Sequence, residues 1–179
     1  MSFPSKTLLL LFLVFTTAYS HGQKIDGGNR HVVTFCGDSL AYTWGKNQHG
    51  QLGNNSLSGS STPVSVNNLD NVVWVDAGSN HSVFLLADST VWTCGFNSYG
   101  QLGDGTSNNS PAPVQVSQMN KVVAIAAGTG HTLYVKADSS VWVNGLNSTG
   151  QFGNGTTTGS NLPIQLNTID SVWKVAAGY

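Results

Sequence analysis

The chain of 179 residues is long enough for one ordinary domain, and its apolar content of 40% is enough for a packed core. Only 8% of its residues are charged, glutamate is absent and the formal net charge is -1. The seven basic residues are scattered singly and do not form the cluster that a phosphate-binding surface requires, so we expect no nucleic-acid partner.

The beginning of the chain has the pattern of a secretory signal. Lys6 precedes an apolar run of eight residues (8–15), and the Ala-Tyr-Ser sequence at 18–20 places small residues at the two positions that a signal peptidase reads. We therefore predict a signal peptide over residues 1–20 and a secreted or extracellular protein. The apolar run is shorter than the roughly 20 residues that cross a bilayer, so we expect no membrane span.

A polar lead over residues 21–25 is followed by a repeat with a period of 50 residues. Its clearest mark is a Gly-Gln-Leu-Gly or Gly-Gln-Phe-Gly sequence, which begins at Gly50, Gly100 and Gly150. The copies cover residues 26–75, 76–125 and 126–175, with the start of a fourth at 176–179. A fixed period of this size is typical of repeat architectures such as solenoids and propellers.

Within the second copy, short apolar runs alternate with turn residues, which predicts four strands. The runs cover residues 72–77, 81–87, 91–94 and, leading into the next copy, 114–116. Gly95, Gly100 and Gly103 punctuate the polar turns, where positive φ or close backbone approach excludes a Cβ. Four short strands per copy is the density of a propeller blade, so we predict an all-β fold, an incomplete β-propeller of about three four-stranded blades.

The run from Trp44 to Gly53, the Ala-Gly-x-x-His step and the trailing Pro-Val or Pro-Ile resemble the repeat of the regulator of chromosome condensation family, from about Asp26 onward. The resemblance implies a β-propeller, usually of about seven blades, whose repeats act as protein-binding surfaces. One member of this family is an exchange factor for the small GTPase Ran, and a secreted bacterial propeller of this kind inhibits β-lactamase.

Three copies are fewer than such a ring needs, since seven repeats of this period would take about 350 residues. An isolated row of three blades would leave two terminal apolar faces exposed. We therefore expect the chain to be a fragment of a longer product, or alternatively to close a ring by self-association.

The repeated polar residues are predicted to be structural. His31, His81 and His131 occur once per copy and are spread around the repeat, so each is expected to make a structural hydrogen bond and not to bind a metal. Aspartate recurs at one turn position, where it is expected to bond its own backbone, as Asp38, Asp88 and Asp138; Asp70 and Asp170 share another turn position with Asn120. No nucleophile elbow or phosphate-binding glycine loop is present, so we predict no enzyme activity and no cofactor.

Tryptophan and cysteine could also mark a site. Trp44, Trp92 and Trp142 are predicted to lie in the core between blades and not to form a stacking platform. Cys36 and Cys94 fall at different phases of two copies, so neither thiol belongs to the repeated scaffold. Secretion would allow a disulfide if their Cα atoms came within about 7 Å, and the sequence leaves both states open.

The best candidates for partner contact are residues that vary where the scaffold is constant. His49, Tyr99 and Thr149 occupy one turn position, just before the repeated glycine. Exposed aromatic and histidine side chains on rigid loops are reasonable contact residues, although a neutral solvated turn would show the same pattern.

These observations predict a secreted, non-enzymatic repeat module that binds a protein or other macromolecule through its propeller loops. One alternative, implied by the resemblance, is a guanine-nucleotide exchange factor for a small GTPase; the signal peptide and the equal length of the copies argue against it. The other is a fragment of a larger secreted propeller enzyme with a site on the channel axis, although these copies contain no convergent acids or metal set.

Overall fold

A computed structural model describes residues 24–178 of the chain, so the predicted signal peptide lies outside the described residues. The described residues form three four-stranded antiparallel sheets, which we call blades 1, 2 and 3 in chain order. Blade 1 contains β1 (Ile25–Gly27), β2 (His31–Phe35), β3 (Ala41–Gly45) and β4 (Ser60–Ser65). Blade 2 contains β5 (Val72–Ala77), β6 (His81–Leu86), β7 (Val91–Gly95) and β8 (Ser110–Gln115). Blade 3 contains β9 (Val122–Ala127), β10 (His131–Lys136), β11 (Val141–Gly145) and β12 (Ser160–Gln165).

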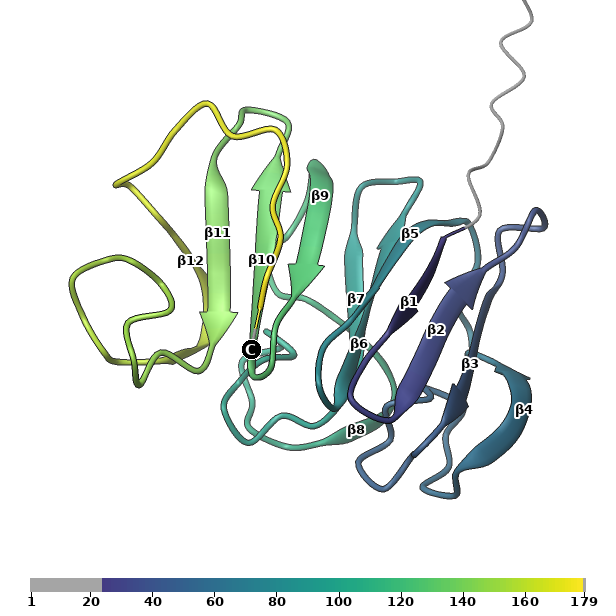
Figure 1. Ribbon diagram of the computed structural model, residues 1–179. Helices are drawn as coiled ribbons and strands as arrows, with labels where there is room; N and C mark the ends of the chain where they lie inside the picture. The colour runs from purple at the N-terminus through teal and green to yellow at the C-terminus, as the bar shows by residue number, and fades with distance from the viewer. Residues whose placement is uncertain (1–23, 179) are drawn as a thin grey trace, which may run out of the picture.

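The three blades stand side by side around an axis, as Figure 1 shows. In each blade the strands are paired in sequence order, so that β1, β5 and β9 form one edge and β4, β8 and β12 the other. The edge strands β1, β5 and β9 contact one another in turn, which places them nearest the axis. This arrangement confirms the predicted all-β fold, an incomplete β-propeller of three four-stranded blades.

The outermost strand of blade 2 corrects one prediction. A strand was predicted only at 114–116, leading into the next copy, whereas β8 starts at Ser110 and pairs with β7 of its own blade, with Val114 opposite Thr93. That start was wrong because the strand was expected to begin after Pro113, whereas β8 includes both Pro111 and Pro113. An edge strand has a side that forms no ladder hydrogen bonds, so it tolerates residues that lack an N–H.

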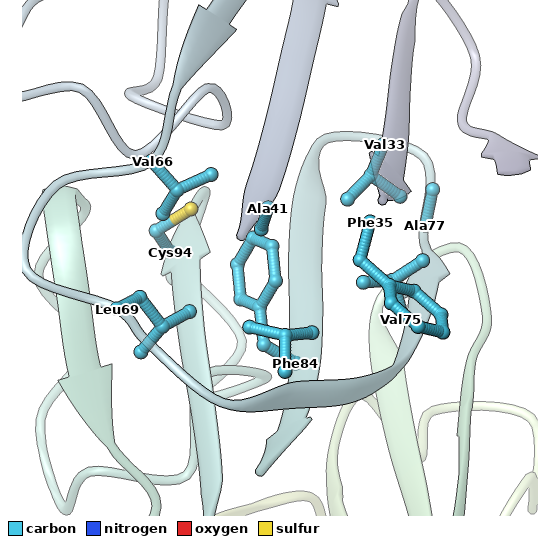
Figure 2. Close-up of a cluster of buried hydrophobic side chains, with 10 residues drawn as sticks. Val33, Phe35, Ala41, Val66, Leu69, Val75, Ala77, Phe84 and Cys94 are labelled. Carbon is cyan, nitrogen blue, oxygen red and sulfur yellow. The ribbon is translucent and has the colours of Figure 1, made fainter. Parts of the chain in front are cut away.

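Two of the three clusters of the apolar core lie between neighbouring blades, and the third, Val141, Val143, Phe152 and Leu166, belongs to blade 3 and the segment after it. Figure 2 shows the first cluster, in which side chains from blade 1 and the segment after it face side chains from blade 2. Its buried members are Val33, Phe35, Ala41, Val66, Leu69, Val72, Val75, Ala77, Phe84 and Cys94. A second cluster joins blades 2 and 3 in the same way, for example through Leu85 and Tyr134. Because full burial of one large apolar side chain is worth roughly 1.5–3 kcal/mol, these boundaries supply most of the stability of the row.

Two tryptophans and one cysteine take part in this core, whereas Trp44 is half-buried and belongs to none of its clusters. Trp92 and Trp142 pack, partly buried, against the first and second clusters, which confirms the predicted role for these two residues. Both cysteines are free. Cys94 is buried in the first cluster, and its burial raises the pKa of the thiol to about 12, so it stays protonated and unreactive at neutral pH.

Candidate functional site

The connections between strands form two opposite faces of the row. The loop face, along the lower side of Figure 1, consists of the long loops and the short turns that precede the histidines. Its residues are 28–30, 46–59, 78–80, 96–109, 128–130 and 146–159. The turn face, at the other ends of the strands, consists of residues 36–40, 66–71, 87–90, 116–121, 137–140 and 166–171.

The long loops of the loop face are held in place by buried asparagines. In blade 1, Asn47 Nδ2 donates hydrogen bonds to the carbonyl oxygens of Ser56 (2.8 Å) and Ser58 (3.0 Å), while its Oδ1 accepts one from the Leu52 amide (2.9 Å). Asn97 and Asn147 make the corresponding bonds in the other two blades, and all three are about 1% exposed or less. These hydrogen bonds therefore fix the conformation of each long loop.

The predicted contact residues sit on a second fixed element, a tight turn in each loop. The backbone amides of His49, Tyr99 and Thr149 donate to the side-chain oxygen of the glutamine two positions later, over 3.1, 3.1 and 3.0 Å. The turn also needs glycine, since a Cβ on Gly50 (φ +87°) would lie 2.3 Å from the Cα of Pro111 in the next blade. The position before the repeated glycine is thus held by backbone bonds that are independent of its side chain, which leaves that side chain free to differ.

Two of the three predicted residues come together in the structure, through a residue that the sequence analysis missed. The ring of His49 packs on Phe96 of the next blade at a centroid distance of 4.9 Å. Phe96 in turn meets Tyr99 edge to face at 5.6 Å, and Tyr99 is 49% exposed. Thr149, at the equivalent turn of blade 3, is exposed.

The contacts of Tyr99 continue onto blade 3. A Cβ added to Gly130 would lie 3.1 Å from Tyr99 Cδ2 and 3.3 Å from Leu146 Cβ, so the two side chains lie over a position that must be small. The other copies have Arg30 and Asn80 at this position. We call the row of His49, Phe96, Tyr99 and Leu146 the aromatic strip. It crosses both blade boundaries.

The charge state of His49 fits an uncharged strip. Partial burial and the nearby Lys46 ammonium both lower the pKa of His49, so the ring is neutral at pH 7. Its Nδ1 lies 3.5 Å from Asn109 Nδ2, a long contact in which the amide is the donor. At neutral pH the rings therefore offer apolar surface and hydrogen-bonding edges but no formal charge.

The repeated histidines form a different and fully buried set of contacts. His31 Nε2 lies 2.9 Å from Ser82 Oγ in the next blade, and Ser82 Oγ donates to the backbone oxygen of Gln51 (2.8 Å). His81 repeats the arrangement with Thr132 and Gln101, at 3.1 and 2.8 Å. We call this pair of linked hydrogen bonds, from histidine to hydroxyl and from hydroxyl to backbone carbonyl, the relay. It confirms the predicted structural hydrogen bonds of His31 and His81.

The relay also defines the protonation state of its histidines. Because each hydroxyl proton is donated to a carbonyl, the hydroxyl oxygen accepts from Nε2–H, which places the proton of the neutral ring on Nε2. Burial lowers the pKa of His31 to about 4 and that of His81 to about 3.

Among residues 24–178, no group of three or more histidine, cysteine or acidic side chains is arranged to hold a metal ion.

A groove of about 540 Å³ follows the axial strands and is the other candidate site. Of its four charged groups, Lys174 forms no salt bridge within residues 24–178 and the other three bond one another or the backbone: Lys24 Nζ lies 2.6 Å from Asp76 Oδ1, and Asp76 Oδ2 accepts the Ala127 amide at 2.7 Å. Asp26 accepts the amide of Ala77 in the same way, at 2.9 Å. These carboxylates link neighbouring blades and are already occupied by the fold.

Three of the five turn-face aspartates are likewise occupied by their own turns. Asp38, Asp88 and Asp138 each accept the amide two residues later, at 3.1, 2.9 and 3.0 Å, which confirms their predicted role. Hydroxyl and amide donors lower the pKa of Asp88 and Asp138, as expected for a hydrogen-bonded carboxylate.

The part of the chain that the structure describes contains no helix able to cross a membrane.

Comparison with known proteins gives consistent results. The sequence matches the family model of the regulator of chromosome condensation (RCC1) repeat over residues 38–85 and 88–135, and a second model of that repeat over residues 72–101 and 122–151. No curated protein sequence matches significantly.

Solved structures of complete propellers share the fold. Human WBSCR16 superposes with a TM-score of 0.73 and 26% identity, over 83% of this chain and 40% of that one. Prp20p of Saccharomyces cerevisiae, studied for its binding to Gsp1p and histones, gives 0.73 and 24% over 81% and 38% of the two chains. Yeast RCC1 (Prp20) bound to Kap60 gives 0.72 and 24% over 87% and 39%. The chain spans about two fifths of the length of these proteins.

Proposed function

This chain belongs to the regulator of chromosome condensation repeat family, and on that premise we propose that it is a secreted, non-enzymatic repeat module that binds a protein or other macromolecule through its propeller loops. The observation that carries the proposal is the aromatic strip, in which Tyr99 is exposed and His49, Phe96 and Leu146 are half-buried, on loops that buried asparagines hold rigid. Rigid loops that present an aromatic side chain lose little conformational entropy on binding, which favours affinity.

Secretion is supported by the apolar run at 8–15 and the small residues at 18 and 20. The absence of catalysis is supported by the bonding of two carboxylates on the axis and three on the turns, which accept backbone amides of the fold itself. The three long loops are of equal length, so no blade has an insertion that could displace a nucleotide from a GTPase. These points favour a binding module over an exchange factor or an enzyme fragment.

The test is affinity capture from the extracellular fluid of the source, with three immobilised forms of the full chain. One is the unchanged protein, the second carries His49→Ala, Tyr99→Ala and Thr149→Ala, and the third carries Asp70→Ala, Asn120→Ala and Asp170→Ala. The third set is a matched control, because these residues share one exposed position on the turn face.

The proposal predicts a macromolecule that the unchanged protein and the turn-face variant retain and the loop-face variant loses. Equal retention by all three forms would contradict binding through the loops. Acceleration of nucleotide release from a small GTPase, measured on the same preparations, would favour the exchange factor instead.

A further inference from the structure

The charges of the molecule are distributed unequally between its two faces. The loop face has one carboxylate, Asp104, against the two cations Arg30 and Lys46. The turn face has five carboxylates and one lysine; they are Asp38, Asp70, Asp88, Asp138, Asp170 and Lys121. The loop face is therefore the side of the molecule that favours an anionic partner.

The two cations of the loop face lie together at one end of the aromatic strip. The amide of Lys46 donates to the carbonyl oxygen of Arg30 over 2.7 Å, so these residues are backbone neighbours in blade 1. Lys46 is also close enough to His49 to lower its pKa. The strip therefore runs from Lys46 in blade 1, through its three rings, to Leu146 in blade 3.

Neither cation is neutralised within the described part of the chain. The one salt bridge among residues 24–178 joins Lys24 to Asp76 on the axis, so Arg30 and Lys46 have no carboxylate within 4.0 Å. Asp104, the only acid of this face, accepts hydrogen bonds from Asn97 (3.2 Å) and Thr106 (2.9 Å). The end of the strip at Arg30 and Lys46 can therefore bind a carboxylate. Among the described residues, the end at Leu146 has no cation that could do so.

The strip also has a spacing that suits an extended chain. Its ring centroids are 4.9 and 5.6 Å apart, comparable to the roughly 6.6 Å between side chains on one face of a β-strand. Apolar side chains at alternate positions of an extended segment could therefore contact successive rings. Aromatic and aliphatic contacts of this kind supply most of the affinity of an interface, and charges at the rim mainly set orientation and association rate.

We propose that the aromatic strip binds an extended segment of a partner protein that has an acidic residue at one end, next to Arg30 and Lys46, and apolar side chains along the rings toward Leu146. The proposal rests on the loop-face function above and adds the chemistry and the direction of the partner. The single cationic end specifies which way the segment runs.

The experiment is a fluorescence-anisotropy titration of the full chain with labelled peptides of about ten residues. The test peptides have two aspartates at one end, either N- or C-terminal, followed by leucine and phenylalanine alternating with serine. Matched peptides replace the aspartates by asparagine, or by lysine. Four variants are compared with the unchanged protein: Lys46→Ala, Arg30→Ala, Tyr99→Ala and, as a turn-face control, Lys121→Asn, which introduces the residue found at this phase in the preceding copy, Asn71.

We expect one orientation of the acidic peptide to bind, and the asparagine and lysine peptides to bind at least tenfold more weakly. Lys46→Ala and Arg30→Ala should each weaken the acidic peptide severalfold and leave the asparagine peptide unchanged, while Tyr99→Ala should weaken both. Lys121→Asn should change neither. Low ionic strength should strengthen the acidic peptide selectively, because exposed charges are screened by salt.

The inference is overturned if no acidic peptide binds, if the lysine peptide binds equally well, or if the lysine and arginine variants behave like the turn-face control. If the capture experiment separates the loop-face and turn-face variants but the acidic peptides fail, the proposed function stands and only this inference falls. Unaltered thermal unfolding of each variant ensures that a loss of binding is not a loss of folding.

Discussion

The relay and the aromatic strip cross the same two blade boundaries, but they are conserved between copies to opposite degrees. The relay is buried and nearly the same at both boundaries, from His31 to Ser82 and from His81 to Thr132. The strip is exposed at Tyr99 and half-buried at its other residues, and its equivalent positions differ in every copy. A buried hydrogen-bonded group that loses its partner is costly, whereas an exposed side chain on a fixed turn can change at little cost to stability. Constancy between copies therefore marks the scaffold, and variation marks the surface that is free to bind.

The largest effect on the scaffold side should come from Gly78→Ala. A Cβ there would lie 2.1 Å from His81 Cε1 and 2.5 Å from the Gly128 carbonyl oxygen, so both the relay histidine and the next blade would have to move. We expect a loss of about 4 kcal/mol or more in the free energy of unfolding, measured in denaturant. Gly27→Ala is the matched control, because nothing lies within 4 Å of its Cβ and the other copies have alanine there. Equal stability of the two variants would show that the close approach is unimportant.

Acid should weaken the scaffold next most strongly. His31 and His81 have folded pKa values of about 4 and about 3, below the ordinary 6.5. The unfolded chain therefore takes up protons first as the pH falls, so stability is complete above about pH 6.5 and decreases below it, down to pH 4 for His31 and 3 for His81. At up to about 1.4 kcal/mol per pH unit for each ring, we expect a loss of roughly 2–4 kcal/mol between pH 7.5 and pH 5.

The matched variant for the pH experiment is His81→Gln. Its amide can still donate to Thr132 Oγ1 but does not titrate. The slope of the unfolding free energy against pH should decrease by the contribution that His81 makes to it. An unchanged slope would show that the pH dependence arises elsewhere.

A smaller loss is expected for Thr132→Val, which keeps the shape but removes the hydroxyl. His81 Nε2–H and the Gln101 carbonyl oxygen, both buried, would then have no partner. Leaving such groups unsatisfied costs about 1–3 kcal/mol in unfolding free energy. Thr132→Ser, which introduces the hydroxyl found at Ser82, should retain most of the stability. A valine variant as stable as the serine variant would contradict the relay's contribution.

The smallest effect on stability should come from the strip. Tyr99→Ala removes one edge-to-face contact with Phe96 from a side chain that is already 49% exposed. We expect a change of less than about 1 kcal/mol in the free energy of unfolding. A larger loss would place Tyr99 in the scaffold.

The repeat made much of the fold predictable, because one period revealed three blades and the same glycine and histidine positions in each. The strands of blade 2 up to β7 followed from apolar runs, and the strand that was misplaced, β8, contains prolines that only an edge position tolerates. His49 and Tyr99 were predicted from their variation, and both lie in the strip, whereas the function proposed for them remains to be tested.

Phe96 was missed because the contact that places it in the strip is made with a different copy of the repeat. Its ring meets His49 of the preceding blade, and this contact arises only when two blades pack side by side. The signal that could have identified it is that its phase holds lysine, phenylalanine and leucine in successive copies, Lys46, Phe96 and Leu146. Two positions of the repeat that lie close together on the same loop and both differ between copies indicate a surface.

The most direct test of the division between scaffold and binding surface measures two quantities, affinity for the acidic peptide and unfolding free energy, on Thr132→Val and Tyr99→Ala side by side. The account predicts that Thr132→Val loses about 1–3 kcal/mol of stability and keeps its affinity under conditions where it is folded, whereas Tyr99→Ala keeps its stability and binds at least tenfold more weakly. Loss of both quantities in either variant, or unchanged affinity in Tyr99→Ala, would contradict it.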